Sequence, residues 1–297
     1  MSVFDPHIIA RIERLELKAR RLVEGLTIGI HRSPYRGIST DFAEHRHYVQ
    51  GDDTRHLDWK IYARSDRFYV KRFQQETNLQ THFLLDCSRS MFFKGEAAAM
   101  SKFDYAATLV ASLAWLLHKQ RDAVGLTLFD SELRLQLPPR ASYSHFRQVV
   151  EAMEKATPGA DTGLGQVLKK VGMQIRRRGL VVVVSDFVAN LAGFGEALGL
   201  HDGEGNEVVL FRIEDPDERL FPYRGAALLR GMENEGELLC DPRDLRNSYL
   251  AARERHVQAL YQSCRRHGFM VEDVPTDAPL DGMLSGFLNL RSALFRR

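Results

Sequence analysis

The residues best suited to chemistry in this sequence follow directly after a short apolar run. Thr81 to Leu85 has the character of a buried strand, and the next residues supply a carboxylate at Asp86 and hydroxyls at Ser88 and Ser90. Ligands of open α/β sheets bind at the carboxyl ends of the strands. One carboxylate and two hydroxyls in a tight loop provide hard oxygen ligands for Mg²⁺ or Mn²⁺. The pattern predicts a divalent-cation site, although Asp and Ser are also common turn residues.

A second carboxylate, Asp186, closes the very apolar run from Leu180 to Ser185. If the two strands are parallel, Asp86 and Asp186 lie at the same edge of one sheet and share a cation, with Asp186 acting through water. The loop from Pro158 to Gly163 opens a helix and offers a third ligand at Thr162 or Asp161. The alternative is a glycine-rich turn in which Asp161 or Thr162 is only the helix N-cap.

Alternating strand and helix patterns must position these residues. The Val, Leu and Ile runs are continuous, which is typical of strands covered on both faces. We therefore predict an α/β fold, a doubly wound and mostly parallel sheet between two helix layers. The expected strands are 81–85, 123–129, 180–184, 207–211 and 269–271, and the expected helices are 103–117, 146–153, 163–175, 245–266 and 283–294.

The first 76 residues have a different pattern. Apolar residues from Ile8 to Leu26 recur at helical spacing with basic residues between them, which predicts one amphipathic helix that packs on a core. Short aromatic and polar pieces follow from Ser33 to Gln75 and indicate a β-rich elaboration. Residues 1–76 are thus expected to form an N-terminal elaboration, and residues 77–297 the α/β domain.

Composition excludes several classes of function. A net charge of +2 on 297 residues gives no overall attraction to nucleic acid, and the arginine clusters are scattered among acidic neighbours. Three cysteines without Cys-x-x-Cys spacing favour neither a disulfide framework nor a zinc site. Since no signal peptide or run of about 18 apolar residues occurs, we expect no membrane span and a cytoplasmic location.

The acids and hydroxyls resemble the metal-ion-dependent adhesion site of the von Willebrand factor A superfamily. That site has an Asp-x-Ser-x-Ser loop, a Thr on a later loop and an Asp after a central strand. Asp86, Ser88, Ser90 and Asp186 match this pattern. The position of the Thr falls on Ala160, which leaves Thr162 or Asp161 as the nearest substitute.

A second resemblance lies upstream, from the Gly-Asp-Asp at residues 51–53 to the Asp-Trp-Lys at residues 58–60. This segment is similar to the signature of the bacterial family named "domain of unknown function 58". The resemblance implies an adaptor or client-recognition partner of a MoxR-type AAA+ ATPase in complex assembly or maturation, docking through an acidic side chain of the ATPase or a client. The charged and aromatic residues of the signature are either a partner-binding surface or an internal salt-bridge network: Asp52, Asp53, Arg55, Asp58, Trp59 and Lys60.

An enzyme is the main alternative, namely a metal-dependent phosphohydrolase that uses Asp86. Such enzymes place a second Asp two residues on, where this chain has Ser88. The sequence also lacks a P-loop and a Gly-x-Ser-x-Gly elbow, and Cys87 is better explained as a small buried residue than as a nucleophile. We therefore expect no catalysis, and we expect Asp86→Ala to leave the fold intact because an exposed loop carboxylate contributes little to a core.

Overall fold

The computed structural model describes residues 6–10, 14–32, 45–47, 69–71, 80–159, 161–175, 179–225, 227–232 and 236–294. The chain divides into a larger unit, Met1–Ile28 with Leu79–Arg297, and a smaller one, Gly29–Asn78. The larger unit contains the main sheet and the candidate site. The first helices therefore belong with the sheet, whereas we had placed them with the β-rich elaboration.

Six strands form the main sheet in the order β10-β7-β6-β3-β4-β5. All neighbours are parallel except β4 and β5, which are antiparallel. The mostly parallel sheet that we predicted is confirmed. The strands are β3 Gln80–Asp86, β4 Ala123–Phe129, β5 Leu133–Arg140, β6 Gly179–Ser185, β7 Glu207–Glu214 and β10 Met270–Pro275.

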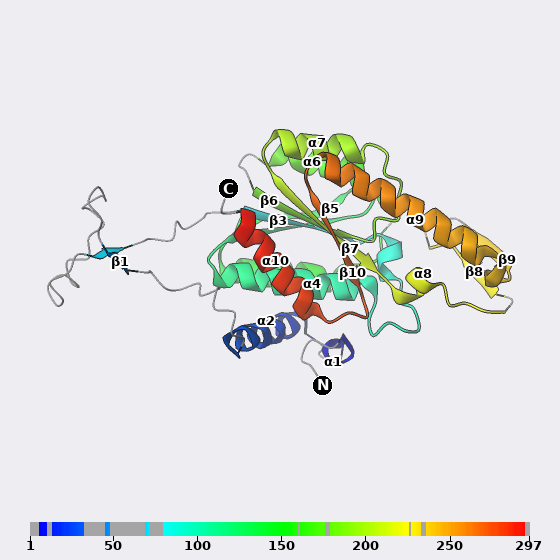
Figure 1. Ribbon diagram of the computed structural model, residues 1–297, viewed down its shortest axis with the longest axis horizontal. Helices are drawn as coiled ribbons and strands as arrows, with labels where there is room; N and C mark the ends of the chain where they lie inside the picture. The colour runs from blue at the N-terminus through cyan, green and yellow to red at the C-terminus, as the bar shows by residue number, and fades with distance from the viewer. Residues whose placement is uncertain are drawn as a thin grey trace. The chain divides into compact units, whose positions relative to one another are not determined.

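Helices cover both faces of this sheet (Figure 1). On one face lie α4 Lys102–Lys119, α5 Tyr143–Glu154 and α10 Leu280–Leu294. On the other lie α6 Leu164–Gln174, α7 Phe194–Gly203 and α9 Pro242–Arg266. Every residue of β6 is buried, because helices exclude water from both sides of this central strand.

The N-terminal segment forms two helices, α1 Pro6–Ala10 and α2 Leu15–Arg32, where we had predicted one. The predicted apolar face of α2, with Leu15, Ala19, Leu22 and Leu26, is buried. The Arg20 guanidinium lies 4.7 Å from the centre of the Trp115 ring of α4. The Leu15 amide also donates a hydrogen bond to Glu154 of α5. Helix α2 therefore packs on the same side as α4 and α5.

Every strand and helix that we expected in the α/β part is present. Several elements were not predicted: the 3₁₀ turn η2 Arg89–Phe92, β5, α7, α8 Pro216–Leu220, and the antiparallel hairpin of β8 Ala227–Arg230 with β9 Glu237–Cys240. Among the helices that the structure describes, none combines the length and apolar character that a membrane span requires.

The smaller unit contains one described pair of short strands. β1 His45–His47 is antiparallel to β2 Tyr69–Lys71. This pair agrees with the β-rich character that we predicted. The signature residues expected to bind a partner, 52–60, lie outside the described residues.

Candidate metal centre at the carboxyl edge of the sheet

Two neighbouring strands bring the predicted carboxylates to one edge of the sheet. Asp86 ends β3, and Asp186 directly follows β6. The two strands are parallel, with Leu85 opposite Val184. Because the carboxyl ends of parallel strands share one edge of a sheet, Asp86 and Asp186 lie at the same edge, as we predicted.

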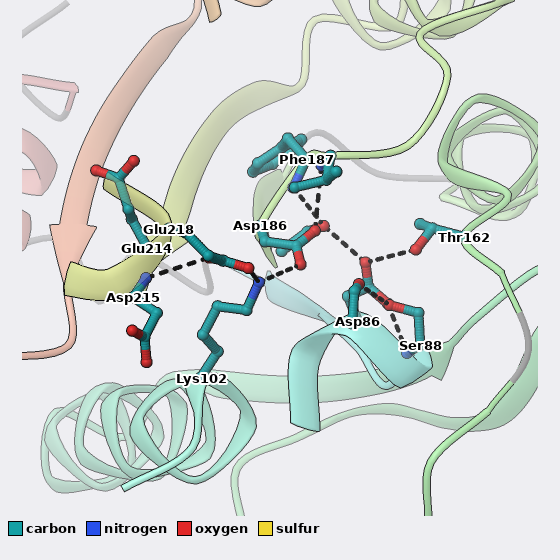
Figure 2. Close-up of polar contacts among 12 residues, drawn as sticks. Asp86, Ser88, Lys102, Thr162, Asp186, Phe187, Glu214, Asp215 and Glu218 are labelled. Atoms are coloured by element: carbon teal, nitrogen blue, oxygen red, sulfur yellow. Dashed lines mark hydrogen bonds and ion pairs between the residues drawn. The ribbon is translucent and has the colours of Figure 1, made fainter. Parts of the chain in front are cut away.

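The Asp86 carboxylate is fully buried and held by three hydrogen bonds. Its Oδ1 accepts from the Ser88 amide at 2.8 Å, and its Oδ2 accepts from the Ser185 hydroxyl at 2.6 Å and the Thr162 hydroxyl at 3.3 Å (Figure 2). Our expectation of an exposed loop carboxylate was therefore wrong. Because Asp86→Ala would leave these donors without an acceptor in a buried position, Asn is the more conservative replacement.

The two serines of the loop lie beside each other. The Ser88 hydroxyl is 3.2 Å from the Ser90 hydroxyl, and Ser88 is fully buried whereas Ser90 is half-buried. A hydrogen bond from Ser90 reaches Asp186 and helps to lower the pKa of that carboxyl. The two serines therefore lie between Asp86 and Asp186, where their hydroxyls could bind the same cation as the acids.

The loop before α6 carries Thr162 to the same place. The Gly159 amide donates to the Cys87 carbonyl at 2.8 Å, which fixes this loop against the one that follows β3. At Gly163 a Cβ atom would collide with the Ser131 carbonyl oxygen, so only glycine allows the approach. Gly163 is also the N-cap of α6, which makes the N-cap interpretation of Asp161 or Thr162 wrong. Ala160 lies outside the described residues.

A strained turn follows Asp186. Phe187 has a φ of 54°, a left-handed conformation that is costly for a bulky residue. Its side chain is buried against Phe194, and its carbonyl accepts a hydrogen bond from His256 at 2.6 Å. Packing therefore holds the turn in which the Val188 amide donates to Asp186 Oδ1 at 3.1 Å. Val188 itself is 62% exposed and forms an apolar rim beside the acids.

The two acids have opposite electrostatic environments. Burial, and then the nearby charge of Asp186, raises the pKa of Asp86 to about 7. Burial also opposes ionisation of Asp186, but the Lys102 ammonium outweighs it and holds the pKa of Asp186 below the usual value. Asp186 thus has a cationic partner, while Asp86 forms no ion pair with any residue that the structure describes.

Three members of this network were not predicted from the sequence. Ser185 donates to Asp86, and Lys102 of α4 forms ion pairs with Asp186 at 2.7 Å and with Glu218 of α8 at 2.6 Å. A signal for Lys102 was available, because it precedes Ala106, Leu109 and Leu113 at the spacing of four and three that marks one helix face. A lysine on that apolar stripe indicates a buried partner.

The residues present fit a divalent cation that prefers oxygen ligands. The site combines two carboxylates with the hydroxyls of Ser88, Ser90 and Thr162, and Asp86 is a buried acid without a counter-charge among the described residues. No cluster of three or more His, Cys, Asp or Glu suited to a metal occurs in the part of the chain that the structure describes. Cys87 is buried, its thiol donates to the Phe129 carbonyl, and burial raises its pKa to about 11, as suits a structural residue.

The parallel sheet between two helix layers agrees with the fold that we expected from the resemblance to the von Willebrand factor A superfamily. The family described as "Protein of unknown function DUF58" matches residues 44–259, so this chain belongs to that family. The chain is 25% identical over 281 residues to the uncharacterized protein Rv1480 of Mycobacterium tuberculosis, a match that covers 93% of this chain and 87% of that protein.

One solved structure supports this fold, and a second is reported beside it. The conserved hypothetical protein BatB from Bacteroides thetaiotaomicron superposes with a TM-score of 0.50 at 15% identity, over 74% of this chain and all of that one. An aerotolerance-related membrane protein from Bacteroides fragilis gives a TM-score of 0.49 at 17% identity, over 70% of this chain and 96% of that one. At these identities the likeness to BatB concerns the fold alone.

Proposed function

We propose that this chain is a metal-dependent protein-interaction module and not an enzyme. The observation that carries the proposal is the fully buried Asp86 carboxylate, which lies among hydroxyl groups without a counter-charge from the described residues. Asp86, Ser88, Ser90 and Thr162 would hold Mg²⁺ or Mn²⁺, with Asp186 acting through water. The cation would supply an open position for a carboxylate of a partner protein.

The surroundings of the site suit recognition. Arg89 and Val188 are exposed at its rim, while the acids beneath them are buried. An acidic side chain of a partner would meet the cation and Arg89, and apolar atoms around it would cover Val188. Complementary charges across an interface contribute specificity more than affinity.

The partner that we propose is a MoxR-type AAA+ ATPase, or a client protein that the ATPase acts on, in the cytoplasm. The proposal rests on membership of the family and on the resemblance that its signature implies. In this arrangement the ATPase hydrolyses ATP, and this chain contributes chaperone-like recognition during the assembly or maturation of a complex.

The test is association of the purified chain with a purified MoxR-type ATPase from the same organism, measured with Mg²⁺ and with EDTA. Wild type should bind only with Mg²⁺, and Asp86→Asn should not bind under either condition. Glu151→Gln is the control, because Glu151 is an exposed acid of α5 that pairs with Lys155 and lies outside the candidate site. Binding that survives EDTA or the Asp86→Asn change would contradict a metal-bridged contact.

A phosphohydrolase would require Asp86 to reach its substrate. Both carboxylate oxygens instead accept hydrogen bonds within the protein, and the side chain is fully buried. Release of phosphate from generic phosphate esters by wild type, lost in Asp86→Asn, would overturn the non-enzymatic proposal. We expect no release above that of the Asp86→Asn protein.

A further inference from the structure

Lys102 is a fully buried lysine that lies beneath the candidate metal centre. It occupies the first turn of α4, directly after the N-cap Ser101. Its Nζ lies between two carboxylates, 2.7 Å from Asp186 Oδ2 and 2.6 Å from Glu218 Oε1 (Figure 2). One carboxylate belongs to the site and the other to α8, so this ammonium connects the two.

The ammonium remains charged in this position. Burial alone would lower the pKa of Lys102, but Asp186 and Glu218 together raise it above the ordinary value. A buried charge is tolerated only when it is paired and hydrogen-bonded, and Lys102 meets that condition on two sides. When all are ionised, the carboxylates of Asp86, Asp186 and Glu218 exceed the single ammonium by two negative charges, which is the charge of one divalent cation.

Glu218 is itself held firmly. It belongs to the capping box of α8, in which its carboxylate accepts from the Asp215 amide, and its carbonyl accepts from the Tyr249 hydroxyl at 3.0 Å. The Glu218 carboxylate is therefore fixed as a second anionic partner of the ammonium.

The start of α8 also binds the chain segment that follows the loop of Asp86, Ser88 and Ser90. The carboxylates of Asp215 and Asp217 accept from the amides of Gly95 and Glu96 at 2.9 and 2.7 Å. A Cβ at Gly95 would collide with both carboxylates, so the close approach depends on glycine. Helix α8 and the site therefore form one packed unit, and Glu218 keeps its place relative to Asp186.

We propose that Lys102 is an internal counter-cation that competes with the divalent cation for Asp186, and that Glu218 weakens this competition by pairing with the same ammonium. Lys102 and Glu218 are then positioning residues that set the affinity of the site for metal. This inference rests on the proposed function, because it presumes that the site binds a cation.

A merely structural role for the pair makes a different prediction. If Lys102 only anchored α4 to the sheet, any change to Lys102 or Glu218 would loosen the site and weaken metal binding. If the ammonium instead competes with the metal, the two variants should change the affinity for the cation in opposite directions. Loss of the ammonium should tighten cation binding, and loss of the Glu218 charge should weaken it, since Lys102 is then left with Asp186 as its single anionic partner among the described residues.

The experiment is calorimetric titration of Mg²⁺ into wild type, Lys102→Met and Glu218→Gln, each checked for a cooperative thermal transition. We expect affinity to rise at least about tenfold in Lys102→Met and to fall at least about tenfold in Glu218→Gln, as the loss of one nearby charge implies. Asp277→Asn is the control, because Asp277 pairs with Arg219 of α8 and does not touch Lys102. It should bind like wild type.

Each outcome decides between the alternatives. Folded Lys102→Met with equal or weaker affinity overturns the inference, as does Glu218→Gln with an affinity equal to that of Asp277→Asn or higher. If Lys102→Met does not fold, Lys102→Gln, which removes the charge but keeps a polar end, is titrated in its place, and a folded variant with equal or weaker affinity again overturns the inference. Absence of Mg²⁺ binding by wild type would instead contradict the proposed function itself, so the two failures are distinguishable.

Discussion

Polar side chains are buried at both ends of strand β3, but their hydrogen bonding differs between the two ends. At the carboxyl end, Asp86 accepts hydrogen bonds on both oxygens from three other residues. At the amino end, the Thr81 hydroxyl and His82 Nε2 are buried without a hydrogen-bond partner among the described residues. Both ends therefore bury polar groups, but only at the carboxyl end do polar groups from several loops meet at one carboxylate among the described residues. This distinguishes the candidate site.

The charges of the two ends differ in the same way. Burial, with His201 as a smaller contributor, lowers the pKa of His82 to about 4, so its ring is neutral at pH 7. Asp86 has a pKa raised to about 7, yet it is surrounded by hydrogen-bond donors that suit the ionised form. A neutral ring needs no counter-charge, whereas a buried carboxylate gains from a cation.

The largest effect is expected in the core between the two ends. Leu84 is fully buried in the cluster beneath α6 and α7, so Leu84→Ala should lower the free energy of unfolding by about 2 to 5 kcal/mol. Leu239→Ala is the matched control, because Leu239 is 76% exposed and should change stability by less than about 0.5 kcal/mol. Urea denaturation measures both, and equal losses would contradict the described core.

The amino end should make folding more sensitive to acid, whereas the raised pKa of Asp86 at the other end acts in the opposite direction over an overlapping pH range. Because the folded pKa of His82 is lowered from 6.5 to about 4, the unfolded chain binds its proton first as pH falls. The stability that His82 contributes above pH 6.5 is therefore lost progressively down to pH 4, by at most about 3 kcal/mol. The free energy of unfolding of His82→Phe minus that of wild type should rise as pH falls over this range; a difference that does not change with pH would show that His82 does not titrate as described.

The smallest effect on stability is expected at the margin of the site. Thr162 makes a long hydrogen bond of 3.3 Å to Asp86, so Thr162→Val should destabilise the metal-free protein by about 1 kcal/mol or less. Its Mg²⁺ affinity should nevertheless fall about tenfold, because one of the proposed oxygen ligands is removed. Thr162→Ser keeps the hydroxyl and should bind like wild type in the same titration. Equal affinity of the Val and Ser variants would remove Thr162 from the site.

Much of the fold could be predicted from local pattern. The continuous apolar runs of β3, β4 and β6 and the spacing of α4 and α9 identified both layers, because burial on two faces leaves a strong sequence signal. Strand β5 was missed because it is an exposed edge strand with two prolines. Helix α8 was missed because five residues carry no periodicity.

The candidate site could be predicted only in part. The two acids and the serines follow directly after strands, so parallel pairing was enough to bring them together. Lys102 and Glu218 come from elements 84 and 32 residues away from Asp186, and only tertiary packing joins them. The burial of Asp86 also could not be predicted, because it depends on three loops closing over one strand end.

The most direct test is calorimetric titration of Mg²⁺ into the metal-free wild-type protein and into Asp86→Asn, with Glu151→Gln of α5 as the control. We predict one Mg²⁺ per chain for wild type and for Glu151→Gln, and no binding heat for a folded Asp86→Asn protein. Equal binding by wild type and Asp86→Asn would contradict a cation held at Asp86, and with it the proposed mode of partner recognition.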